Sequence, residues 1–273
     1  MTKRDYAEQV AEIVNGTVTE VEKANGVKKM GISRKLGNGA SPNVYVDDMF
    51  TKGLTVDEAA QEVNRLFIAN PNVDFDTTTV TEFEKVKSNL RVRLFNNKTN
   101  AEVFKSAEEY GFDDLIITPY ILVGQFMGNT GTIKVGTAML DTWGVTADEV
   151  IQIGMENSKA EGFEVISMID MLANMMGKTP EELTAMGMVD DGRMYVISNK
   201  DRMFGAVGAI ILADELKEKF PSGYVVIPSS IHEVIVVPRE LGDDKGTLDS
   251  MVNEVNTTAV SPEEVLGSKV YIF

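Results

Sequence analysis

The stretch that decides the fold is YVISNKDRMFGAVGAIILADELKEKFPSGYVVIPSSIHEVIVVP, residues 195–238. It opens with a short β-branched run and continues with small and apolar residues at helical spacing over 204–220. Two further apolar runs follow at 224–227 and 233–237, joined through Pro228-Ser229-Ser230. This order predicts a strand, a helix and two strands, which is typical of an α/β protein.

The same order of elements is predicted upstream of this stretch. A helix over 248–255 completes the C-terminal pattern, and a short strand over 270–273 closes it. Over 90–159 the expected elements are strand 92–95, helix 100–110, strands 115–123 and 132–135, and a helix capped by Thr146 and Glu149. We therefore expect two similar β-α-β-β-α modules with mixed or antiparallel sheets. Chance alternation is the alternative, because the side chains of the two modules do not repeat.

The N-terminal part predicts a helix, a hairpin and a second helix. Asn25-Gly26 separates two strand-like runs, and this dipeptide accepts the positive φ of a type I′ turn. Thr55 and Glu58 form the capping box of the second helix. The predicted class is thus α/β (α+β), in three parts: 1–89, 90–192 with a methionine-rich helical linker near 160–192, and 193–273.

The predicted linker contains a cluster of methionines. They are Met168, Met171, Met175, Met176, Met186 and Met188. Methionine-rich segments can bind soft metals or hydrophobic helices. Their helical spacing beside Leu172 and Leu183 favours ordinary helix packing instead.

Composition excludes several classes of function. The 273 residues include no cysteine and a single histidine, so disulfides, thiolate sites and clusters of imidazole ligands are excluded, and we predict no metal and no cofactor. The net charge is −16, which disfavours binding to nucleic acid. The longest apolar run, 206–213, is far shorter than the about 20 residues that span a membrane. These features predict a cytoplasmic protein with no membrane contact.

Five polar residues are candidates for a functional site. Ser230 and His232 would share one face of a strand and could act as nucleophile and base. Asn199 and Lys200 lie between a strand and a helix, where open α/β sheets place ligands. Asn253 lies on the helix over 248–255 and could help to hold a ligand. The alternative for each is a structural role as a cap, a turn or a solvated surface residue.

Several long segments resemble a known bacterial family. They are VDFDTTTVTEFEKVKSNL (73–90), YVISNKDRMFGAVGAIILADELKEKF (195–220), IPSSIHEVIVVP (227–238) and MVNEVNTTAVSPEEVLGSKVYIF (251–273). Together with SPNVYVDDMF (41–50) they resemble domain of unknown function 5688 over nearly the whole chain. The resemblance implies a bacterial, non-secreted protein, often from genomes rich in mobile elements. It implies no activity and no functional residue.

Two main hypotheses of function remain. The first is a non-catalytic intracellular protein that binds a macromolecular partner, because no complete catalytic set can be assembled around one histidine. A narrower form of it is an acidic inhibitor of a nucleic-acid-binding protein, whose partner would be basic. The alternative is a hydrolase-like enzyme that uses Ser230 and His232. A cleft that joins Asn199, His232 and Asn253 would favour the enzyme.

Overall fold

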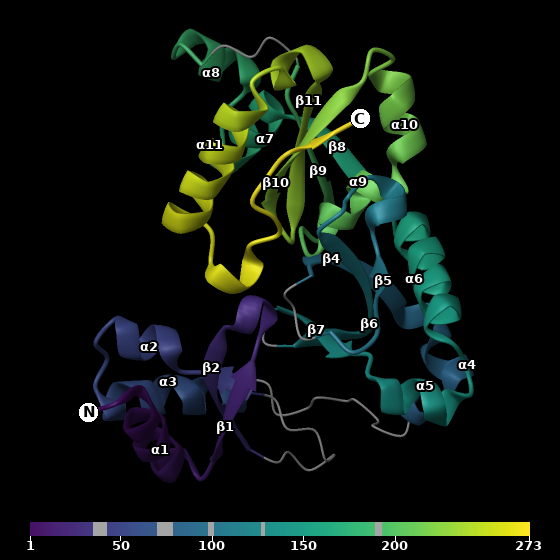
Figure 1. The fold of residues 1–273 in the computed structure, drawn as a ribbon. Helices are drawn as coiled ribbons and strands as arrows, with labels where there is room; N and C mark the ends of the chain where they lie inside the picture. The colour runs from purple at the N-terminus through teal and green to yellow at the C-terminus, as the bar shows by residue number, and fades with distance from the viewer. Residues whose placement is uncertain (35–42, 70–78, 98–100, 127–128, 189–192) are drawn as a thin grey trace.

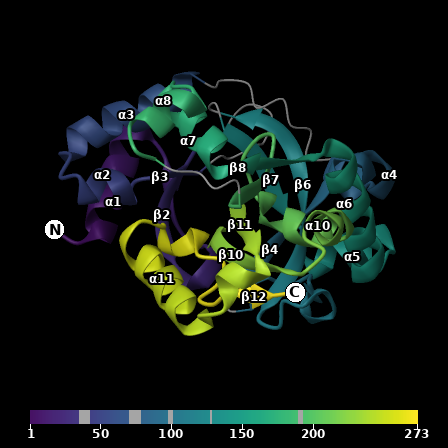
Figure 2. The same ribbon diagram turned by 90° about the horizontal axis from the view of Figure 1, so that it is seen from above.

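The computed structural model describes residues 1–34, 43–69, 79–97, 101–126, 129–188 and 193–273. In these residues the chain forms three sheets, in which every strand pair is antiparallel (Figure 1). Viewed from above, the strands lie at the centre and most helices surround them (Figure 2). The predicted α/β class with antiparallel sheets is therefore confirmed. None of the described helices is long and apolar enough to cross a membrane.

The N-terminal sheet has its own core. Its elements are α1 (Lys3–Val14), β1 (Thr17–Glu22), β2 (Lys28–Ser33), β3 (Asn43–Tyr45), α2 (Asp47–Thr51) and α3 (Val56–Ala69), with strand order β1-β2-β3. Asn25 and Gly26 between β1 and β2 adopt φ of 61° and 70°, the region that this turn requires. Tyr6, Ile32 and Phe67 are buried between the helices and the sheet.

The middle sheet is built around one long strand. Its elements are α4 (Phe83–Val86), β4 (Leu90–Asn96), β5 (Lys105–Ser106), β6 (Leu115–Phe126), β7 (Asn129–Lys134), α5 (Thr137–Trp143) and α6 (Ala147–Glu161). Strand β4 pairs with one side of β6, and β5 and β7 pair with the other. The helix predicted over 100–110 is wrong in its described part, which forms β5 and a 3₁₀ turn at Glu108–Tyr110. Val103 and Ala107 are buried four residues apart, a helical spacing that tertiary packing overrides here.

Helix α6 protects the open edge of this sheet. The N–H of Val92 in the edge strand β4 donates to the Ser158 hydroxyl (3.2 Å), and Asn157 donates to the Leu90 carbonyl (3.0 Å). A Cβ on Gly154 would approach Val92 Cγ1 to 2.8 Å, so glycine lets α6 lie close to the strand. The edge is thus covered by the protein's own chain.

The C-terminal sheet has the strand order β12-β10-β11-β9-β8. Its elements are β8 (Phe163–Ser167), α7 (Met168–Met176), α8 (Pro180–Ala185), β9 (Tyr195–Asn199), α9 (Gly208–Ile211), α10 (Ala213–Lys219), β10 (Tyr224–Ser230), β11 (Glu233–Pro238), α11 (Lys245–Thr258) and β12 (Tyr271–Ile272). The segment predicted as a helical linker therefore also supplies the edge strand β8. On β11, Val234 and Val236 face one core, and Val237 faces another beneath α11.

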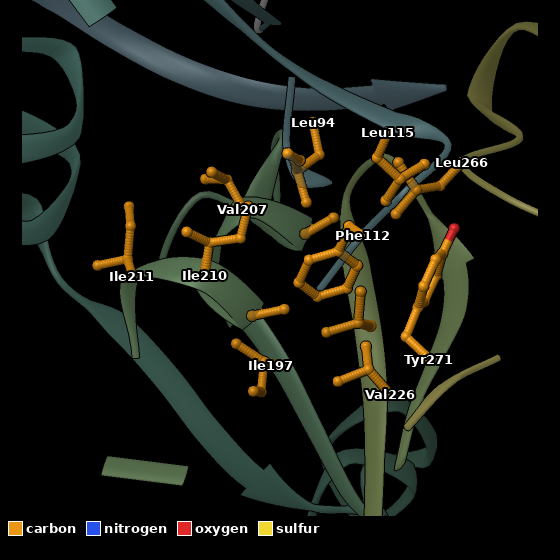
Figure 3. Close-up of a cluster of buried hydrophobic side chains, with 14 of the residues drawn as sticks. Leu94, Phe112, Leu115, Ile197, Val207, Ile210, Ile211, Val226, Leu266 and Tyr271 are labelled. Atoms are coloured by element: carbon orange, nitrogen blue, oxygen red, sulfur yellow. The ribbon is translucent and has the colours of Figure 1, made fainter. Parts of the chain in front are cut away.

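The middle and C-terminal sheets share a single hydrophobic core (Figure 3). Leu94 and Phe112 from the first pack with Ile197, Val226 and Leu266 from the second. Burial of each large aliphatic side chain contributes about 1.5–3 kcal/mol, so this core joins the two sheets firmly. The predicted similarity of the two modules does not hold, because the described residues between β4 and β6 contain no α-helix.

Candidate functional site

A cavity of about 530 Å³ lies where the three sheets meet. Its wall includes Lys23, Lys29 and Tyr45 from the N-terminal part, Arg93, Phe95, Thr118 and Lys134 from the middle sheet, and Phe204, His232, Glu263 and Glu264 from the C-terminal part. Clefts of this size between structural units commonly bind ligands. We therefore take this cavity as the candidate site.

Arg93 is the most unusual residue of the cavity wall. The carbon of its guanidinium lies 4.7 Å from the ring centre of Phe95, 5.3 Å from that of Tyr120 and 4.6 Å from that of Phe204. Its Nε donates a long hydrogen bond of 3.4 Å to the Thr118 hydroxyl. Among the residues that the structure describes, no carboxylate forms an ion pair with Arg93. The positive charge is thus enclosed by aromatic faces.

The surroundings of Arg93 do not remove its charge at neutral pH. Burial lowers the pKa of the guanidinium to about 10, which leaves it protonated. Burial also raises the pKa of Tyr120 to about 12, so the phenol beside Arg93 is neutral. Ring faces contribute about 0.5–2 kcal/mol to holding a cation, less than a carboxylate at the same place could give.

The Phe204 ring is positioned by a strained turn that follows β9. Arg202 and Phe204 have φ of 50° and 59°, a left-handed conformation that is costly for side chains of this size. The Phe204 N–H donates to His232 Nδ1 (3.1 Å), and the two rings stack 5.6 Å apart. The Asn199 amide donates to the Met203 carbonyl (2.6 Å) and accepts from the Met203 N–H (2.8 Å). These contacts hold the aromatic wall of the cavity in place.

His232 occupies the turn between β10 and β11. The expectation that it shares a strand face with Ser230 is therefore wrong, because β10 extends to Ser230 and the turn falls at Ile231 and His232, just before β11 begins at Glu233. The Ser230 hydroxyl accepts a hydrogen bond from the His232 backbone N–H (3.1 Å). The imidazole uses Nδ1 for Phe204, and its Nε2 lies 3.6 Å from Glu264 Oε1. This geometry supports a positioning role for His232 more than a serine–histidine pair.

The other predicted site residues are only partly brought together. Asn199 and His232 meet at the turn that carries Phe204. Lys200 is exposed at the start of that turn. Asn253, on α11, donates to the carbonyls of Asp249 (2.7 Å) and Ser268 (2.8 Å) and so fastens the C-terminal segment to the helix. Asn199, Lys200 and Asn253 do not line the cavity.

A polar clasp closes one side of the cavity. Lys29 forms an ion pair with Glu263, and the Asn25 amide donates to the carbonyls of Pro262 (2.7 Å) and Val265 (2.9 Å). Burial opposes both charges of the ion pair. Glu263 nevertheless raises the pKa of Lys29, and Lys29 lowers the pKa of Glu263. The clasp joins the N-terminal sheet to the C-terminal part of the chain.

Sequence reasoning missed Arg93 and Phe204. In LRVRLFN (90–96) the arginines alternate with buried aliphatic residues, a pattern that indicates a solvent-facing strand side. Within the described residues, no group of three or more carboxylate or histidine side chains could hold a metal ion.

Comparison with known proteins identifies the family alone. A search of curated proteins and a search of solved structures found no match. A family model described as "Family of unknown function (DUF5688)" matches residues 2–273, which is essentially the whole chain. This protein therefore belongs to that family.

Proposed function

We propose that this protein is a non-catalytic binding protein whose central cavity holds an organic anion. The observation that carries the proposal is the guanidinium of Arg93, enclosed by three aromatic rings and without a carboxylate partner in the described part of the chain. A partly buried charge without an opposite charge is costly, and a bound carboxylate or phosphate would offset that cost.

The cavity wall suggests the kind of anion. Arg93 presents a planar set of donors that matches carboxylate and phosphate oxygens. Phe95 and Phe204 beside it supply apolar surface for the body of the ligand. The ligand class is thus a carboxylate or phosphate carried on an apolar or aromatic group. We also propose, as the sequence predicts, that the protein is bacterial and cytoplasmic.

Ligand-induced stabilisation tests the proposal. The probes are benzoate, phenyl phosphate and inorganic phosphate at up to about 10 mM, and the measurement is the thermal midpoint, which rises when a ligand binds the folded state alone. We expect the two aromatic anions to raise the midpoint of the wild type and inorganic phosphate to raise it less. Arg93→Met should abolish the response.

The matched control is Arg91→Met. Arg91 lies two residues away on the same strand, but its Nε donates to Glu161 (2.7 Å) and it does not line the cavity. This variant should keep the wild-type response. A wild type that responds to no aromatic anion, or an Arg93→Met variant that responds fully, would contradict the proposal.

A further inference from the structure

The helical hairpin α7–α8 exposes an unusual number of large apolar side chains. Met175 in α7 and Met186, the C-cap of α8, are 67% and 58% exposed, and Met176 in α7 and Met188 just beyond α8 are exposed as well. Ala173 and Leu183 are the only buried residues of the two helices, both of which are described in full. The hairpin therefore presents a methionine-rich surface that the described chain leaves largely uncovered.

The caps and turns of the hairpin hold it in shape without deep burial. Ser167 caps α7, and Thr179 forms a capping box with Glu182 at the start of α8. Gly177 ends α7 in a left-handed conformation at φ 62°. Because these local bonds fix the backbone, the methionine side chains can adapt to a surface laid against them. Covering them gains about 25 cal/mol for each Å² removed from water.

The charged side chains of the hairpin indicate what kind of molecule could bind its methionines. Glu181 and Glu182 are exposed on α8, and Asp170 is exposed on α7. Lys178 is the single basic side chain between them. These exposed carboxylates, the acidic rim of the hairpin, repel a second copy of this chain, whose net charge is −16, and equally repel anionic lipid and nucleic acid. The rim matches a basic partner.

We propose that the α7–α8 hairpin is a docking surface for a basic amphipathic helix of a partner protein. Flexible methionines suit the apolar face of such a helix, and the acidic rim suits the lysines and arginines on its sides. This inference is independent of the anion proposed for the central cavity. It gives the basic protein partner expected from the sequence a defined surface on the molecule.

Peptide binding tests the docking surface. The probe is a fluorescent leucine–lysine peptide of about 18 residues with one apolar face, and the measurement is fluorescence anisotropy with the full chain. The control peptide has the same composition in an order that destroys the apolar face. We expect the amphipathic peptide to bind at least about tenfold more tightly than the control peptide.

Paired variants locate the binding. Met175→Ser combined with Met186→Ser removes the apolar contacts without changing the charge, and should weaken binding of the amphipathic peptide by at least about tenfold. Met251→Ser is the control, because Met251 is 55% exposed on α11 and lies outside the hairpin, and it should bind as the wild type does. Equal binding of both peptides, equal loss in both variants, or a self-association that only the double variant abolishes would overturn the proposal.

Discussion

The wall of the central cavity and the α7–α8 hairpin are built in opposite ways. At the cavity, Asn199, His232 and Phe204 hold one another through hydrogen bonds and ring stacking, in a backbone conformation that is costly on its own. In the hairpin, each helix buries one residue and local caps fix the shape. The difference suggests that the cavity is organised in advance for the proposed anion, whereas the hairpin can adapt to the proposed helix.

The largest expected difference in the free energy of unfolding comes from replacing one glycine by alanine in each region. A Cβ on Gly205 would lie 2.4 Å from the Asn199 nitrogen and 2.7 Å from the His232 carbonyl oxygen, and both are backbone atoms. We expect Gly205→Ala to lower the free energy of unfolding by about 3 kcal/mol. The control, Gly177→Ala in the hairpin, meets nothing within 4 Å and should cost about 1 kcal/mol from its φ of 62° alone. Chemical denaturation compares them, and equal losses would contradict the rigid cavity wall.

His232→Ala should have the next largest effect. It removes the acceptor for the Phe204 N–H and the ring that stacks on Phe204. We expect a loss of about 1–3 kcal/mol in the free energy of unfolding. His232→Asn, whose side-chain oxygen can accept the same hydrogen bond, should recover part of it. An unchanged thermal midpoint in His232→Ala would remove the positioning role and revive the hydrolase hypothesis.

The clasp at Glu263 should show a smaller effect that depends on pH. Desolvation opposes the ionised carboxylate, but Lys29 lowers its pKa below the ordinary 4.5, so its stabilising contribution is present above about pH 4.5 and is lost as the pH falls through the lowered value. We expect Glu263→Gln to cost about 1 kcal/mol at neutral pH. The difference from wild type should shrink as the pH falls through the lowered pKa of Glu263. Glu240→Gln, an exposed control, should match the wild type throughout, and a loss in Glu263→Gln that persists in acid would contradict the ion pair's role.

The smallest effect should come from the hairpin surface. Met175 is 67% exposed, so Met175→Ser should change the free energy of unfolding by less than about 0.5 kcal/mol. Leu183→Ala, at one of the two buried hairpin positions, should by contrast cost about 2–5 kcal/mol. If Met175→Ser destabilises the chain as much as Leu183→Ala, the surface is packed in the free protein and the contrast with the cavity fails.

Local signals in the sequence located much of the fold but only the edge of the site. The capping boxes at Thr55 and Thr146 form the hydrogen bonds that their spacing predicts. The cavity could not be predicted because Arg93 and Phe204 come together only when two sheets pack. They lie 111 positions apart, and sequence periodicity indicates local structure, not contacts over such a separation. Likewise, the sequence predicts a helical linker where β8 forms, because a five-residue edge strand between helices has too few residues to show a clear alternation.

The clasp also determines which part of the molecule can form first during synthesis of the chain. The side chain of Asn25 can form its two hydrogen bonds only after Pro262 and Val265 have been synthesised, and these lie 237 and 240 positions later in the chain. At about 5–20 residues per second, the ribosome needs roughly 10–50 s to supply them. During that interval the N-terminal sheet can fold on its own core, but the cavity lacks a wall. The anion proposed for this cavity could therefore bind only after residues 262–265 have left the ribosome.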